Sequence, residues 1–207
     1  FIAGNWKMHL DRAAIAGFCE DLAGTSAPDG VTLGVFPPFV YLSEVVEALA
    51  GTDVVVGAQT ARPEEQGAFT GEVAMRMVKD VGARSVIVGH SERRHVFGET
   101  DADVRARLDA GLALGLDIIL CVGETIEERK GGRTTEVISR QLKAGIEGLD
   151  GKFVADRITV AYEPVWAIGT GEVATPAQAQ EAHAELRGLA RELAGADAAE
   201  RLIIQYG

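Results

Sequence analysis

The sequence predicts an α/β fold, a (β/α)₈ barrel with seven of its eight strands present, and three observations favour it. Short β-prone runs alternate with amphipathic segments of helical period, at roughly thirty residues per unit. Repeated βαβ units of this kind build a parallel sheet. The nucleotide-binding patterns GxGxxG and GxxxxGK[ST] follow none of the predicted strands, which favours a barrel over a doubly wound open sheet.

We expect one domain over residues 1–207 that is incomplete at its carboxyl end, because a barrel needs eight strands and typically ~250 residues. The predicted strands are Phe1–Trp6, Thr32–Phe36, Asp53–Ala58, Ser85–Gly89, Asp117–Val122, Arg157–Glu163 and Arg201–Tyr206. The predicted helices are Arg12–Ala23, Val40–Leu49, Val73–Val81, Asp101–Leu114, Thr134–Leu149 and Thr175–Ala194.

Composition argues against several classes of function. The net charge of −11 disfavours nucleic acid and anionic membranes as partners, since both need a basic surface. No apolar run approaches the ~20 residues of a membrane span, and we expect no signal peptide. The two cysteines, Cys19 and Cys121, are too few for a disulfide framework. We therefore expect the protein to lie in the reducing environment of the cytoplasm. We expect both to be buried, structural thiols.

The segment Ala161–Gly171 carries the strongest candidate for chemistry. Glu163 stands where a buried strand ends, and Pro164 prevents the ladder from continuing. Carboxyl ends of parallel strands are where α/β folds place their active sites. The residues that follow are apolar and end in glycines, as a water-excluding lid requires. A surface Glu with a packed loop is the alternative. The predicted lid comprises Pro164, Val165, Trp166, Ala167, Ile168, Gly169, Thr170 and Gly171.

A second candidate segment follows the fourth strand. Ser91 is a plausible N-cap of a helix, and Glu92 suits its first turn. A His at such a helix start feels the positive end of the dipole, which disfavours a charged imidazolium at His90. A structural His that caps a turn is the alternative. The spacing of His90 and His95 does not fit a zinc pair, and we expect no metal.

Asn5 and Lys7 end the first strand, where Lys7 offers a cation to a phosphate group unless it is simply solvated. The long polar stretch Gln59–Glu72 is another candidate, because loops of this length tend to be functional or disordered. Its centre, Gly67–Gly71, is less polar than its flanks and suits docking; a solvent loop is the alternative. His183 and the run Glu127–Lys130 read as solvated surface.

Three motifs, Gly4–Met8, Gly89–Arg94 and Ala161–Gly171, resemble the signature segments of triosephosphate isomerases, in the right order. The resemblance covers the whole chain and implies a TIM barrel. It makes Glu163 the catalytic base and His90 a neutral electrophile, a tuning for which this family is the known example. It makes Lys7 the substrate-binding cation, paired with Glu92, which takes part in proton handling. Asn5, Ser91 and the backbone of Gly169 would contact the substrate.

The resemblance further implies the interconversion of dihydroxyacetone phosphate and D-glyceraldehyde 3-phosphate through an enediolate, a step of glycolysis and gluconeogenesis. No cofactor is implied. A homodimer is implied, with Phe69, Thr70 and Gly71 in the loop that enters the partner. Two departures, His9 and Thr60, stand where the family commonly has Asn. The alternatives are another barrel isomerase or aldolase, and a catalytically impaired fragment that binds sugar phosphate weakly or not at all.

Overall fold

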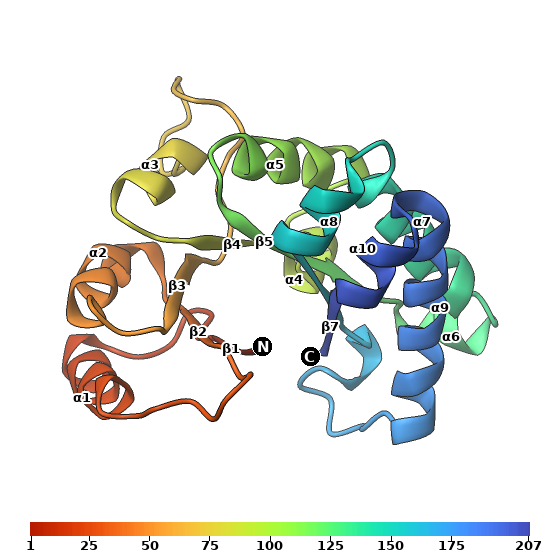
Figure 1. Ribbon diagram of the computed structural model, residues 1–207, viewed down its shortest axis with the longest axis horizontal. Helices are drawn as coiled ribbons and strands as arrows, with labels where there is room; N and C mark the ends of the chain where they lie inside the picture. The colour runs from red at the N-terminus through yellow and green to blue at the C-terminus, as the bar shows by residue number, and fades with distance from the viewer. The chain divides into compact units, whose positions relative to one another are not determined.

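Parallel strands form the framework of each of two compact units. The computed structural model describes residues 1–207, and the units are residues 1–87 with 110–117 and residues 88–109 with 118–207. Within each unit the strands are hydrogen-bonded in chain order, and the ladders described are parallel (Figure 1). The first unit holds β1 (Ile2–Asn5), β2 (Leu33–Phe36), β3 (Val55–Ala58) and most of β4 (Ser85–Val88). The second holds most of β5 (Asp117–Val122), with β6 (Ile158–Tyr162) and β7 (Ile203–Tyr206).

The predicted fold class is confirmed: parallel strands alternate with helices, as in a (β/α)₈ barrel of which seven strands are present. The bounds of β5 were predicted correctly, and the other strands are one or two residues shorter than predicted. Several of the predicted residues that fall outside the strands are charged or glycine, among them Asp53, Gly89 and Arg157.

Six helices match predicted segments, and four short ones were missed. The predicted ones are α1 (Arg12–Ala23), α2 (Phe39–Ala48), α3 (Met75–Asp80), α5 (Asp101–Ala113), α7 (Thr134–Ile146) and α9 (Pro176–Ala194). The missed ones are α4 (Ser91–His95), α6 (Ile126–Lys130), α8 (Gly151–Arg157) and α10 (Ala196–Arg201). Each missed helix has only five to seven residues, too few for a hydrophobic period to show.

Each unit has its own apolar core between strands and helices. In the first unit, α1 and α2 lie side by side and α2 contacts β3 (Figure 1). Phe36, Val45 and Val86 are fully buried there. In the second unit, the longest helix, α9, packs along α7. Leu186 from α9 and Ile138 from α7 are fully buried in that core. No helix of the chain has the length and hydropathy that a bilayer crossing needs.

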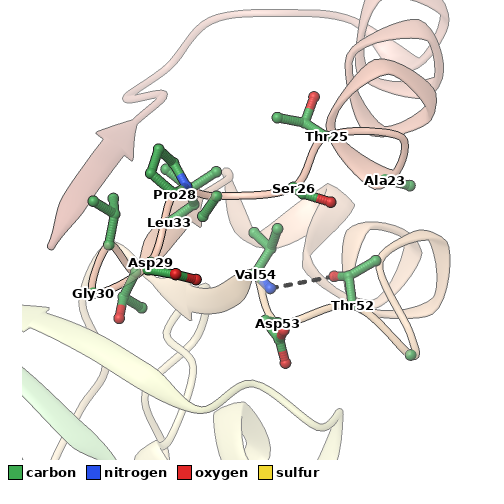
Figure 2. Close-up of a pocket in the computed structure, with 14 residues that line it drawn as sticks. Ala23, Thr25, Ser26, Pro28, Asp29, Gly30, Leu33, Thr52, Asp53 and Val54 are labelled. Atoms are coloured by element: carbon green, nitrogen blue, oxygen red, sulfur yellow. Dashed lines mark hydrogen bonds between the residues drawn. The ribbon is translucent and has the colours of Figure 1, made fainter.

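A hollow of about 450 Å³ lies at the amino ends of β2 and β3, at the opposite strand ends from the predicted site. Figure 2 shows its polar lining, including the carboxylates of Asp29 and Asp53 and the hydroxyl of Thr52, which accepts from the N–H of Val54. No Lys, Arg or His lines it, so it has no cationic side chain to attract a phosphate. Ligands of open and barrel α/β folds bind at the carboxyl ends of the strands instead.

Candidate active site

Glu163 and His90 contact each other at the carboxyl ends of β6 and β4. Oε1 of Glu163 lies 3.3 Å from Nε2 of His90, and both side chains are about nine-tenths buried. Oε2 of Glu163 accepts a hydrogen bond of 2.9 Å from the backbone N–H of Ser91. The backbone N–H of Glu163 donates to the carbonyl of Val122. The carboxylate is therefore held in a defined place by groups from the fourth strand end.

His90 caps the short helix α4 with its own ring. Nδ1 accepts from the N–H of Glu92 at 3.2 Å, and Oε2 of Glu92 lies 3.6 Å from the same nitrogen. An accepting Nδ1 carries no proton, which leaves the ring proton on Nε2, facing Glu163. The prediction of Ser91 as the N-cap was wrong: Ser91 is the first helical residue, because the ring of His90 already occupies the capping position. The N–H of Ser91 is thereby free to bind Glu163.

Cys121 on β5 touches the same carboxylate. Its thiol hydrogen-bonds Glu163, and burial together with the charge of Glu163 raises the pKa of Cys121 well above its ordinary value. A thiol that stays protonated is a hydrogen-bond donor and a poor nucleophile. Cys121 and Cys19 are both buried and free, so the predicted buried thiols are confirmed.

Asn5 and Lys7 lie at the carboxyl end of β1, in the first unit. The backbone N–H of Lys7 donates to Oδ1 of Asn5, and the amide of Gln59 donates to the carbonyls of both Lys7 and Phe36. These bonds hold Lys7 at a positive φ of 48°, a conformation that costs energy for a residue other than glycine and is concentrated at functional sites. Gln59 was noted in the sequence only as part of a polar loop.

Comparisons with known proteins agree on one family. A model of the triosephosphate isomerase family matches residues 1–207. Proteins named triosephosphate isomerase from Pseudomonas putida and Citrifermentans bemidjiense are 47% and 50% identical to the chain. Each of these alignments covers all of this chain and 82% of the relative. The chain belongs to the triosephosphate isomerase family. The resemblance inferred from the three motifs is confirmed.

In this family member the predicted lid, Pro164–Gly171, is fastened at its amino end. Residues 165–167 form one turn of 3₁₀ helix, and the hydroxyl of Thr170 donates to the carbonyl of Trp166. Gly169 and Gly171 have positive φ values of 67° and 84°, so both positions need glycine. A hollow of about 770 Å³ lies beside Trp166 and is lined by residues of α6 and the start of α9. That side of the lid is therefore not packed.

Glu124 holds Trp166 of the predicted lid segment and was missed in the sequence. It is fully buried and accepts from the indole N–H of Trp166 at 3.0 Å and from the hydroxyl of Tyr162 at 3.1 Å. Arg129 completes the network with an ion pair to Glu124 of 3.0 Å and lies over the Trp166 ring. Burial and the charge of Glu124 raise the pKa of Tyr162, so its hydroxyl remains a donor. The capping box of Thr125 and Glu128 fixes α6, and with it Arg129.

His183 on α9 is not the solvated residue that was predicted. Its ring packs edge-on against Tyr162, 6.1 Å between centroids, and its Nε2 atom is buried without a hydrogen-bond partner. Burial lowers the pKa of His183 below its ordinary 6.5, with a smaller contribution from the charge of Arg187. His183 therefore packs behind the Glu124 network, because Tyr162 contacts both His183 and Glu124.

The loop that contains Phe69, Thr70 and Gly71 is closed by its own residues. The guanidinium of Arg62 lies 4.1 Å from the centre of the Phe69 ring, and the N–H of Glu72 donates to the Phe69 carbonyl. Phe69 is still 38% exposed. Over the whole chain, no three His, Cys, Asp or Glu side chains are grouped so that they could hold a metal ion.

Proposed function

We propose that the chain catalyses the reaction for which its family is named, the interconversion of dihydroxyacetone phosphate and D-glyceraldehyde 3-phosphate. The proposal depends above all on one observation, the buried contact between the Glu163 carboxylate and His90 Nε2. A carboxylate at that place can remove a proton next to a carbonyl group and return it to the adjacent carbon. The ring N–H of His90 can donate to the oxygen on which negative charge develops.

The remaining residues are assigned supporting roles. Lys7 supplies a positive charge to the substrate, Glu92 pairs with Lys7 and takes part in proton handling, and Asn5 contacts the substrate oxygens. The N–H of Ser91 holds the Glu163 carboxylate in its resting place, and substrate must draw the carboxylate away from it. The lid closes over the phosphate, to which Gly169 offers its backbone N–H, and excludes water. The two compact units act together as a single domain, a proposal that one cooperative unfolding transition would support.

Steady-state kinetics of Glu163→Gln test this assignment. A positioned general base supplies roughly 10²–10⁴-fold, so we expect kcat to fall by about that factor with a much smaller change in KM. Glu185→Gln, on the exposed face of α9, is the matched control and should leave both constants unchanged. A Glu163→Gln variant that keeps most of its turnover would remove Glu163 from the role of base. Binding of a substrate analogue by the unmodified chain without turnover would identify it as a catalytically impaired fragment.

His90→Gln tests the electrophile. We expect a lower kcat and more release of inorganic phosphate per turnover. The enediolate is less stabilised in this variant, so a larger share of it eliminates phosphate before it is reprotonated. Phosphate release measured alongside isomerisation separates the two effects. Unchanged values for both would contradict the role. Activity should survive dialysis against EDTA, since the proposed chemistry uses no metal or other cofactor.

We further propose that the chain forms a homodimer through the loop around Phe69, Thr70 and Gly71. The half-exposed phenyl ring of Phe69, held by Arg62 on a loop of fixed shape, is the feature that supports this role. Light scattering should give about twice the chain mass of 21.9 kDa, and Phe69→Ser should return it to the monomer value. A monomer without the substitution would contradict the proposal. We expect the protein in the cytoplasm.

A further inference from the structure

Arg94 makes contacts that the proposed mechanism does not use. It sits in the last turn of α4, and its side chain is only 8% exposed. Nε donates to the carbonyl of Gly89 at 2.8 Å, and a second nitrogen lies 3.4 Å from the carbonyl of Cys121. The third guanidinium nitrogen pairs with Asp101 at 2.6 Å, which compensates the buried charge. One side chain therefore links the ends of two strands.

The two carbonyls that Arg94 holds belong to residues next to the reacting groups. Gly89 immediately precedes His90, and the thiol of Cys121 hydrogen-bonds Glu163. Gly89 has a positive φ of 71°, and a Cβ at that position would come within 2.8 Å of the Arg94 guanidinium. Backbone and guanidinium therefore fit closely at the point where the chain turns from β4 towards His90.

We propose that Arg94 is a positioning residue for the His90–Glu163 pair. Its guanidinium binds the carbonyls of Gly89 and Cys121 at the same time and holds the two strand ends at a fixed spacing. That spacing sets the separation of 3.3 Å between His90 Nε2 and the Glu163 carboxylate. The inference rests on the proposed function for its effect on turnover, but the geometry it describes exists with or without catalysis. A planar fork of donors is needed, because an ammonium group offers no fixed geometry to two carbonyls and a carboxylate.

The variant Arg94→Lys keeps the charge and removes the fork. A misplacement of about 1 Å can cost around 10²-fold in rate, so we expect kcat to fall about 10–100-fold while KM stays within about threefold. The matched control is Arg93→Lys on the same helix. Arg93 pairs with Glu99 and not with the carbonyls of Gly89 and Cys121, so this variant should keep its kcat.

A second readout does not depend on turnover. The ring nitrogens of His90, assigned with His90→Gln, should shift in ¹⁵N NMR spectra of Arg94→Lys and not of Arg93→Lys. If the unmodified chain has no isomerase activity, the proposed function fails, and the ring shifts alone test the positioning role. Asp101→Asn weakens the ion pair that holds Arg94 but keeps Arg94 itself. It should shift the His90 signals and lower kcat in the same direction as Arg94→Lys, but by smaller amounts. Unchanged His90 signals in Arg94→Lys, or an equal kcat loss in Arg93→Lys, would overturn the inference.

Discussion

Tyr162→Phe should cost about 1.5 kcal/mol of unfolding free energy. The substitution removes one hydroxyl from a fully buried pair and leaves the ring, so no cavity forms. A hydrogen bond to a charged group contributes ~1.5–3 kcal/mol. Here the hydroxyl lies 3.1 and 3.2 Å from the two oxygens of Glu124, long for an O–H donor, which places the cost at the lower end. Glu124 keeps Trp166 and Arg129, which limits the loss further.

Urea unfolding followed by circular dichroism measures this cost. If the slope of the unfolding free energy against urea concentration is the same for Tyr162→Phe and the unmodified chain, both expose the same surface on unfolding. Tyr206→Phe is the matched control, because that tyrosine is 46% exposed and the change should stay within about 0.5 kcal/mol. Combining Tyr162→Phe with Trp166→Phe should give a coupling energy above about 0.5 kcal/mol, since both rings donate to Glu124. Equal costs for the two tyrosine variants would refute the claim that Glu124 is stabilised by the Tyr162 hydroxyl.

Three further changes follow from the packing. Gly123→Ala should lower the unfolding free energy by more than about 3 kcal/mol or prevent folding, because its Cβ would lie 1.7 Å from the carbonyl oxygen of Glu163. The control Gly188→Ala, where the added Cβ meets open space, should raise the unfolding free energy by about 0.4–1 kcal/mol in the same urea assay. Because the pKa of His183 is lowered in the folded chain, the unfolded chain binds more protons below about pH 6.5, and the unfolding free energy falls as the pH drops. His183→Gln should reduce this fall, and an unchanged dependence of the unfolding free energy on acid pH would contradict the prediction. Cys121 should react with iodoacetamide only in urea, because burial raises the pKa of its thiol; labelling of the folded chain, read by mass spectrometry, would contradict this.

The sequence predicted the strands and the two strand-end groups because both depend on local patterns. The apolar run of β6 stops at Glu163 and Pro164, and that break can be read directly from the chain. The turn at His90 was located as well. Its capping residue was not, because a ring nitrogen acting as the cap is not part of the usual side-chain preference for Ser, Thr, Asp and Asn.

What could not be predicted depends on contacts between distant residues. Glu124 follows β5 in a polar stretch, and its partners Tyr162 and Trp166 lie 38 and 42 positions further along. Nothing local distinguishes Glu124 from the neighbouring acidic residues Glu127 and Glu128. His183 likewise looked like a surface residue on an amphipathic helix. Its Nε2 atom is buried only because α9 packs on distant elements, among them β6, which carries Tyr162, and β7.

The indole of Trp166 gives this protein a built-in optical reporter. The chain has two tryptophans, and Trp6 is buried against the Phe18 ring in the first unit. Trp166 stands on the lid with its N–H on a carboxylate and a guanidinium beside its ring. Fluorescence depends on such neighbouring charges, so release of the indole from Glu124 changes the emission. With Trp6→Phe, the remaining signal comes from Trp166 alone, so a change of emission on adding substrate would report movement of the predicted lid.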